Sequence, residues 1–450
     1  MTLPAPQLIT NLPANEPGAG KLLDYKGAIA LVVANTIGTG VFTTSGFALS
    51  DLGERHYVLL AWLAGGLYAL AGVIVYADLA EQFPQTGGEY VFLRRLLHPA
   101  LGVVAGWISL VAGFTAPIAA AALGAELYFS RVVGFTVGAP WISSIIVISL
   151  ALLHGGAPKQ GVTFQNLAVS IKVAAIVAFI LFGTPGVIEQ IREQPITENG
   201  NFSPIAFAGA LVWISFAYSG WNAAVYVAGD VEGGGPTVKR ALYAGTFLVT
   251  ALYLGVSAVI LYGAPINEIK GVADSGAVAA LYLGGEYLER SLSVLISLAL
   301  ITSASSMLVT GPRVYAQMAR DRVLPQFMGM MHGEHPRIAI LIQAALCLLV
   351  IWITTLRDIL DFVGVTLSMS AGMVMIAWLN HEYRTRPYSP RNLQTVAALA
   401  FLLTTLGIAW ATLTMRPWST VAALILISVG IIAYVISPKQ TISEFSNTAS

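Results

Sequence analysis

The sequence predicts an all-α membrane protein with twelve transmembrane helices, arranged as a five-plus-five inverted repeat with two further C-terminal helices. Three observations predict this fold class. Of the 450 residues, 56% are apolar and only 10% are charged, whereas a soluble domain carries about 25% charged residues. Apolar runs of about 20 residues, the length that crosses a bilayer, recur along the chain. Glycines interrupt the first and the sixth of these runs, which are corresponding positions of two five-helix halves.

Twelve expected spans follow one another along the chain. The third run is long enough to cross the bilayer with a strong tilt. The expected spans are 26–49, 57–80, 100–130, 139–155, 162–183, 205–230, 240–263, 290–311, 337–356, 359–380, 394–414 and 417–436. They divide the chain into a first repeat (26–184), a second repeat (204–380) and the last two helices (393–437).

The two ends of the chain are expected to be tails. Residues 1–25 contain four prolines and no apolar core, which is typical of a disordered segment and not of a signal peptide. Lys and Arg occur about twice as often in the loops on the N-terminal side of the expected membrane as in the opposite loops, and cytoplasmic loops carry such an excess. We therefore expect a multi-pass protein of the cytoplasmic (inner) membrane with both termini in the cytoplasm, including the C-terminal tail at 438–450.

Composition also argues against several classes of function. The formal net charge is zero, so nothing indicates a nucleic-acid partner. The single cysteine, Cys347, cannot form an intrachain disulfide, and the six histidines lack the spacing of metal ligands. We expect no cofactor and no metal. An intramembrane enzyme needs His, Asp or Cys clustered within the spans, and a channel needs a ring of charges or carbonyls; the sequence shows neither pattern.

The first and sixth spans carry the signal of broken helices. The first reads KGAIALVVANTIGTGVFTTSGFAL, with Gly38 and Gly40 near its middle. A glycine inside a helix costs about 1 kcal/mol relative to alanine, so the pair favours local unwinding. The sixth span repeats the pattern with Gly220 in FAYSGWN. Backbone groups freed by a break cannot stay unpaired in lipid, so each break predicts a protein-lined cavity and a polar ligand. Close helix packing through glycine is the alternative explanation.

Two such breaks suit a zwitterion. The second half of the first helix begins near Thr39 and Gly40, where free N–H groups and the positive end of the helix dipole favour a carboxylate. The first half of the sixth helix ends within FAYS, where free carbonyls can accept from an ammonium. Neither break contains a charged side chain, which favours an amino acid bound by backbone groups. Phe216, Tyr218 and Trp221 are candidates for a gate or a wall, although aromatic side chains also simply pack in membrane helices.

Lys172 lies well inside the fifth span. A cation at such a depth costs roughly 2.5–3.5 kcal/mol, so it indicates a functional site. Three roles stay open: an ammonium that replaces a coupling sodium ion, a lysine that exchanges protons, or a structural donor to a broken helix. Ser303 belongs to a group of hydroxyls in the eighth span that suit a cavity, an ion site or helix packing. Thr115 and Pro117, which are separated by one residue, together indicate a distortion of the third span. We include Thr115 and Ser303 among the candidate substrate-binding residues, and Glu126 is a candidate proton site.

Four motifs in order resemble the amino acid–polyamine–organocation (APC) transporter superfamily, over nearly all of residues 22–440. NTIGTGVF resembles the unwound segment of its first helix, and PQTGGEYVFLRR followed by GVVAGW resembles its loop between helices 2 and 3. FAYSGWN resembles helix 6 of the L-type and bacterial amino acid permease branches. GPRVYAQMARDRVLP resembles the cytoplasmic segment after helix 8.

The resemblance implies that Ile37, Thr39 and Gly40, around Gly38, hold the substrate carboxylate. The middle residue of this glycine motif is often serine in the family and is Thr39 here. This departure bears on the size of the substrate.

The resemblance also assigns residues to the other end of the substrate and to coupling. Phe216, Ala217 and Ser219 would hold the amino group through main-chain carbonyls, with Phe216 as the gate. Asn222 falls where L-type relatives have an asparagine at the site, and Ser219 stands at a position that varies between branches. Lys172 matches a lysine that occupies the sodium position in sodium-independent relatives.

We therefore expect a sodium-independent secondary transporter of amino acids, most simply neutral ones, working by alternating access and by exchange or proton symport. Its partners would be a small amino acid, the lipid bilayer and, for symport, protons. A polyamine or other organic-cation exchanger is the alternative, and it would prefer a carboxylate near the breaks, where the sequence has none. The sequence does not predict an oligomeric state.

Overall fold

The computed structural model describes residues 23–135, 138–156, 161–193, 202–330, 336–386 and 392–436. The predicted C-terminal tail and most of the predicted N-terminal tail lie outside these ranges. The last residues of the predicted N-terminal tail are structured, because Asp24 caps the first helix and Leu23 pairs with Val231 in an isolated bridge.

Nearly all of the described chain is helical. The α-helices are α1 (Tyr25–Thr36), α2 (Thr39–Leu52), α3 (Arg55–Gln82), α4 (Glu89–Leu96), α5 (Pro99–Ile108), α6 (Ala116–Val133), α7 (Trp141–Gly156), α8 (Gly161–Glu193), α9 (Pro204–Tyr218), α10 (Gly234–Tyr262), α11 (Ile266–Ile269), α12 (Ser275–Arg320), α13 (Arg337–Ile353), α14 (Leu356–Thr385), α15 (Asn392–Met415) and α16 (Pro417–Ile436). A π-helical segment, η1 (Ser109–Thr115), joins α5 to α6, and two 3₁₀ segments are η2 (Ala223–Asp230) and η3 (Gln326–Gly329).

Ten helical segments within the described ranges are long and apolar enough to cross a membrane. Two more predicted spans appear as shorter apolar helices, α7 and α13. The ten long segments agree with an all-α membrane fold, while the count of twelve and the boundaries of the two repeats stay predictions.

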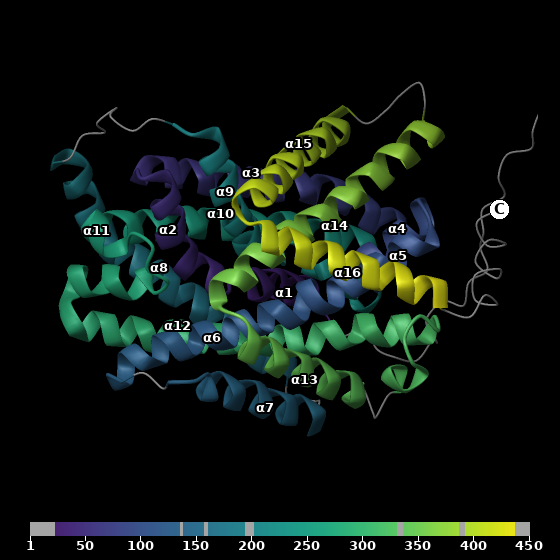
Figure 1. The fold of residues 1–450 in the computed structure, drawn as a ribbon, viewed down its shortest axis with the longest axis horizontal. Coiled ribbons are helices and arrows are strands. Elements are labelled where there is room, and N and C mark those ends of the chain that lie inside the picture. The colour runs from purple at the N-terminus through teal and green to yellow at the C-terminus, as the bar shows by residue number, and fades with distance from the viewer. Residues whose placement is uncertain are drawn as a thin grey trace, which may run out of the picture.

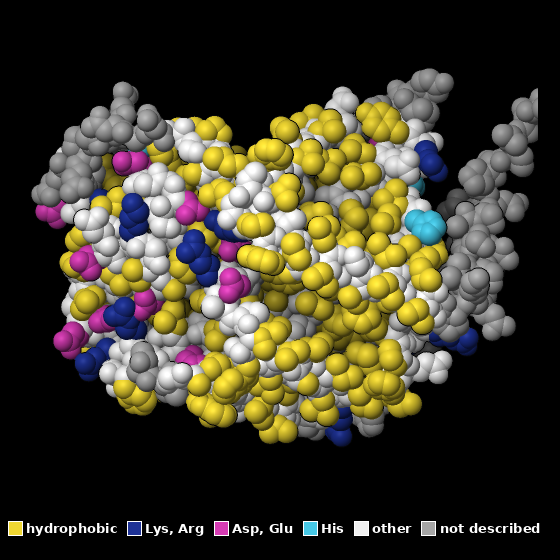
Figure 2. Space-filling model, in the orientation of Figure 1, with side chains coloured by type: hydrophobic (Ala, Val, Ile, Leu, Met, Phe, Trp, Pro, Cys, Tyr) yellow, Lys and Arg dark blue, Asp and Glu magenta, His cyan; other side chains and the backbone are white. Residues whose placement is uncertain are grey.

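The helices pack side by side around a central pair formed by α1 and α2 (Figure 1). The most extensive contacts join α3 to α10 and α6 to α12. In the view of Figure 1, α7 and α13 lie together at the lower edge, α15 lies at the upper edge, and α16 crosses in front of the bundle and packs against α5. Apolar side chains cover the middle of the face drawn in Figure 2, and charged side chains gather toward its left end. Such an apolar surface is stable in lipid and not in water.

The first membrane segment is interrupted at Ile37 and Gly38. Helix α1 ends at Thr36, and Ile37 takes an extended conformation with φ −74° and ψ 90°. Gly38 is also extended, with φ −125° and ψ −153°, and α2 then begins at Thr39 without a side-chain cap. The first amides of α2 are therefore free of the usual intrahelical and capping partners.

The sixth segment is interrupted between Tyr218 and Ala223. Helix α9 ends at Tyr218, and Ser219 turns to φ −56° and ψ 144°. Gly220 follows with φ +98°, a conformation that glycine adopts far more easily than other residues. The chain then continues as η2 instead of an α-helix.

Glycines let the two breaks touch. A Cβ added to Gly40 would lie 2.5 Å from the Cα of Ala217, and one added to Gly220 would lie 2.6 Å from the carbonyl oxygen of Asn35. The hydroxyl of Tyr253 on α10 lies 2.6 Å from the carbonyl oxygen of Thr36 and 2.9 Å from that of Ala217. The two interruptions are thus fixed against each other by backbone contact and by one buried tyrosine.

Two other helices depart from the predicted spans. The distortion expected in the third span is the π-helical segment η1, where the Thr115 hydroxyl donates to the Leu110 carbonyl at 2.6 Å, five residues earlier. The eighth span is longer than predicted: α12 runs from Ser275 to Arg320, with non-helical torsions at Gly284 and Gly285. The predicted span began at residue 290, after this kink, because polar residues around the kink interrupt the apolar run.

Two carboxylates near the ends of predicted spans, Asp78 and Glu126, are buried. Asp78 accepts a hydrogen bond from the indole of Trp378 at 2.7 Å. Glu126 accepts from the backbone amide of Ser143 at 3.0 Å and from its hydroxyl. Helix packing thus gives each carboxylate partners that its position in the sequence does not reveal.

The contact between the breaks predicts that Gly40→Ala destabilises the protein. The added methyl would press against the backbone of Ala217, and overpacking of this kind costs about 1–3 kcal/mol. Gly407→Ala is the matched control, since no heavy atom lies within 4 Å of its added Cβ. Thermal unfolding of the two purified variants in detergent should show a lower melting temperature for Gly40→Ala alone; equal melting temperatures would contradict the contact.

Candidate substrate site between the two helix breaks

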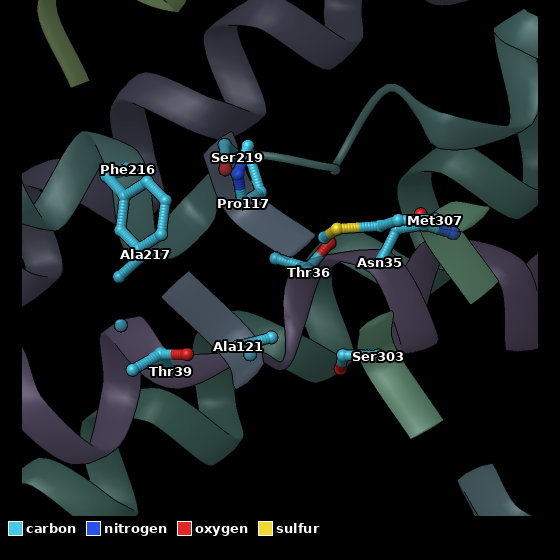
Figure 3. A pocket seen from close by; sticks show the side chains of 12 residues that line it. Asn35, Thr36, Thr39, Pro117, Ala121, Phe216, Ala217, Ser219, Ser303 and Met307 are labelled. Atoms are coloured by element: carbon cyan, nitrogen blue, oxygen red, sulfur yellow. The ribbon is translucent and has the colours of Figure 1, made fainter. Parts of the chain in front are cut away.

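A small cavity lies between the two breaks (Figure 3). Its volume is about 10 Å³, close to the space of one water molecule. The lining comes from both breaks and from α6 and α12: Asn35, Thr36, Gly38, Thr39, Gly40, Pro117, Ala121, Phe216, Ala217, Ser219, Ser303 and Met307. An amino acid is larger than this, so binding requires the surrounding helices to move apart.

The cavity is lined by both polar and apolar groups, and its lining carries no charged side chain. Phe216 and Ala217 lie on one side of it and Thr39 and Ala121 on the other, in the view of Figure 3. The Thr39 hydroxyl donates to the carbonyl of Ala120 on α6 at 3.1 Å, so it is held away from its own helix end. The uncapped amides at the start of α2 are therefore the strongest site for an anion in this cavity.

Backbone carbonyls at the ends of α1 and α9 are partly satisfied. The Phe216 carbonyl accepts from the Ser219 amide at 2.8 Å, and the Ala217 carbonyl faces the Tyr253 hydroxyl. Each carbonyl oxygen has two lone pairs, so these oxygens keep capacity for a further donor. This edge of the cavity can accept hydrogen bonds, whereas the α2 edge can donate them.

Lys172 reaches the first break from α8. Its ammonium donates to the Ile37 carbonyl at 3.0 Å and to the Ser303 hydroxyl at 2.8 Å. The Ser303 hydroxyl lies 3.0 Å from the Ala34 carbonyl and 2.6 Å from the Ile37 carbonyl. Lys172 is 3% exposed, and no ion pair joins it to a carboxylate of the described residues. Oxygen atoms of two helices thus surround the lysine, as they would surround a metal cation.

The structure brings most of the predicted site residues together. Those that line the cavity are Gly38, Thr39, Gly40, Phe216, Ala217, Ser219 and Ser303. Ile37 lies at the break and directs its carbonyl to Lys172.

Four other predicted residues face elsewhere. The Tyr218 hydroxyl donates to the Trp62 carbonyl at 3.1 Å, and the Thr115 hydroxyl donates within η1. Trp221 packs edge-on against the ring of Tyr76, with 4.7 Å between the ring centroids. Asn222 donates to the carboxylate of Glu89 at 2.6 Å.

Sequence reasoning did not assign five lining residues to the site: Asn35, Thr36, Pro117, Ala121 and Met307. Pro117 and Ala121 are four residues apart on α6, as Ser303 and Met307 are on α12. This spacing places each pair on one helix face, so the assigned Ser303 could have indicated Met307. Asn35 is a polar residue in an apolar run; its amide donates to the Leu31 carbonyl and to the Ser306 hydroxyl.

Comparison with known proteins identifies the family of the chain. The family model described as "Amino acid permease" matches residues 23–448. The chain is 29% identical to the serine/threonine exchanger SteT of Bacillus subtilis (strain 168), over 75% of this chain and 78% of that protein. It is 25% identical to the human large neutral amino acids transporter small subunit 2, over 80% of this chain and 70% of that protein.

A third relative is the human Asc-type amino acid transporter 1, which is 23% identical over 86% of this chain and 78% of that protein. These relatives are transporters and not enzymes. The match covers all the described helices that could cross a membrane, including the two breaks and the cavity between them. The chain therefore belongs to the amino acid permease family of the APC superfamily, as an integral multi-pass membrane protein of amino acid transport.

Proposed function

We propose that this protein is a sodium-independent secondary transporter that carries a neutral amino acid across the cytoplasmic membrane by alternating access. The observation that carries the proposal is the pair of helix ends at one buried, uncharged cavity. The substrate carboxylate binds the free amides at Thr39 and Gly40. Its ammonium binds the carbonyl edge formed by Phe216, Ala217 and Ser219.

The lining of the cavity supports a small, neutral side chain. Ala121, Pro117 and Met307 limit the space, while Asn35 and Ser303 supply polar groups. A charged substrate side chain would be desolvated here without a partner of opposite charge, which is costly. The printed names of two relatives support a neutral side chain, since one specifies serine and threonine and the other large neutral amino acids; only the first supports a small one. Serine and threonine are therefore the first substrates to test.

Lys172 supports independence from sodium. Its ammonium is bound by the oxygen atoms of Ile37 and Ser303, which are the hard ligands that an alkali cation would need. A second cation at the same place would meet direct charge repulsion in a site of low dielectric constant. Two roles for Lys172 are compatible with this. The ammonium keeps α1 bound against α8 and α12 throughout the transport cycle, or it releases α1 when it loses a proton.

Alternating access is supported by closing contacts at both ends of the cavity. At the end opposite the N-terminus, Arg416 pairs with Asp51 of α2 at 2.9 Å and with Asp361 of α14 at 2.7 Å. At the N-terminal end, Leu23 pairs with Val231, and Arg313 pairs with Asp230 at 3.0 Å.

In the proposed cycle, α1 to α3 with α9 and α10 rock against α5 to α7 with α12 and α13, and Phe216 closes over the substrate. The polyamine exchanger stays the alternative. It is less well supported, because no carboxylate lines the cavity.

A transport screen tests the proposal. Purified protein in liposomes should take up labelled serine, threonine or another neutral amino acid from the set of twenty, at equal rates in sodium and in choline buffer. A pH gradient or an amino acid preloaded inside should accelerate uptake, which separates proton symport from exchange. Uptake of polyamines alone, or a strict sodium requirement at every pH, would contradict the proposal.

Lys172→Met should weaken transport without unfolding the protein. Loss of the ammonium removes its hydrogen bonds to the Ile37 carbonyl and the Ser303 hydroxyl, so α8 no longer holds the first break. Because a hydrogen bond from a charged group is worth about 1.5–3 kcal/mol, we expect kcat/KM to fall about tenfold or more.

Lys239→Met is the matched control. Lys239 makes an exposed ion pair with Glu81, and such pairs contribute little to stability. Its kcat/KM should equal that of the unchanged protein. Equal kcat/KM values for both variants would show that Lys172 has no part in transport.

A further inference from the structure

A second buried charged residue lies away from the cavity, at the first position of α4. Glu89 is 4% exposed, and α4 lies between two segments that could cross the membrane and is not itself one of them. It lies at the end of the molecule where Leu23 pairs with Val231, because η2 connects Asn222 to that bridge. This is the end that we expect to face the cytoplasm.

The carboxylate of Glu89 joins three elements. Its Oε1 accepts from the Tyr76 hydroxyl of α3 at 2.9 Å and from the Asn222 amide at 2.6 Å. The Tyr226 hydroxyl lies beside the carboxylate, but Oε2 is buried with no donor in hydrogen-bonding geometry among the described residues. A Cβ on the neighbouring Gly88 would lie 2.4 Å from the Tyr226 ring. Helix α4 and η2 are therefore in close contact at this carboxylate.

Among the described residues, no cation forms an ion pair with Glu89. On its own helix, Arg94 pairs with Asp321 of α12, and the arginine nearest to the end of η2, Arg313, pairs with Asp230. Helix α5 carries no titratable side chain. The titratable groups that face the carboxylate are the hydroxyls of Tyr76 and Tyr226.

Helix α14 also packs against α4, and near its C-terminal end it carries His381, Glu382, Tyr383 and Arg384. None of these four contributes to the pKa shift of Glu89. Burial raises the pKa of Glu89, and the nearby Tyr226 hydroxyl together with the hydrogen bonds from Tyr76 and Asn222 lowers it by less.

We propose that Glu89 is a proton-binding site of the gate at this end of the molecule, protonated while η2 is packed against α3 and α4 and ionised when they separate. The inference rests on the proposed function, because alternating access requires η2 to move against the rest of the bundle. On closure the carboxylate takes a proton from water on that side, and on opening it returns the proton to the same side.

The direction of the pH effect follows from hydration. Opening lets water reach the carboxylate, which favours its charged form, so the pKa of Glu89 is higher in the closed state than in the open state. Protonation therefore stabilises the closed state fully below the open-state pKa, and this stabilisation is lost as pH rises through the closed-state pKa. The transport rate should therefore increase as pH rises from the open-state pKa to the closed-state pKa of Glu89.

The test measures exchange of L-serine, or of the amino acid that the screen above selects, in proteoliposomes at equal pH on both sides from 5 to 9. The exchange rate of the unchanged protein should rise with pH through one transition. Glu89→Gln, which cannot ionise, should exchange at the low rate found at acidic pH and should show no transition. Glu126→Gln is the matched control: it neutralises another buried carboxylate and should keep the transition.

Tyr76→Phe supplies a graded test that does not depend on the folding of Glu89→Gln. It removes one donor to the carboxylate, so the charged form is less stable in the closed state and the transition should move up by about one pH unit. If Glu89 had a purely structural role, Tyr76→Phe would leave the midpoint of the pH transition unchanged.

The outcomes separate the inference from the proposed function. If the unchanged protein carries no amino acid, the proposed function fails. If it carries an amino acid, but Glu89→Gln keeps the transition or Tyr76→Phe leaves the midpoint in place, only the assignment of Glu89 fails. Loss of the transition in Glu126→Gln alone would move the proton site to Glu126.

Discussion

The structure depends on one constraint: backbone groups inside a membrane protein need hydrogen-bond partners that lipid cannot supply. At the two breaks this need is met by donors and acceptors from distant parts of the chain. Tyr253 reaches the carbonyls of Thr36 and Ala217, while Lys172 and Ser303 reach the carbonyl of Ile37. The start of α2 has no side-chain cap. The backbone carbonyls at the breaks thus have hydrogen-bond donors within the protein, whereas the first amides of α2 remain available to a ligand.

This asymmetry explains why the site can be selective without charged side chains. A fixed arginine or carboxylate in the cavity would be a desolvated charge whenever the substrate is absent. Helix ends carry only partial charges, so the empty cavity can close to about the volume of one water molecule. The same cost of burying a charge applies to Glu89, whose carboxylate is buried and, in our proposal, is neutralised by a proton while it stays buried.

The sequence predicted the parts of this arrangement that local chemistry determines. Glycines 38, 40 and 220 indicated both interruptions, and the depth of Lys172 in an apolar run indicated that it needs partners. It did not predict the directions of Tyr218, Trp221 and Asn222, which lie next to the second break but contact Trp62, Tyr76 and Glu89. Those directions are set by the turn at Gly220 and by packing against helices far away in the sequence. Tyr253 could not be found either, since an aromatic residue in an apolar helix has no distinctive pattern.

The central claim is that both ends of a zwitterion are bound by backbone groups at the two breaks. Competition with labelled L-serine uptake, or with uptake of the selected amino acid, tests it most directly when the competitors lack one end. Ethanolamine and serinamide lack the carboxylate, and 3-hydroxypropionate lacks the ammonium. The account predicts that unlabelled L-serine competes and that none of the three analogues does at the same concentration. Competition by either amine as strong as that of L-serine would contradict it, because the amides of α2 would then contribute nothing to binding.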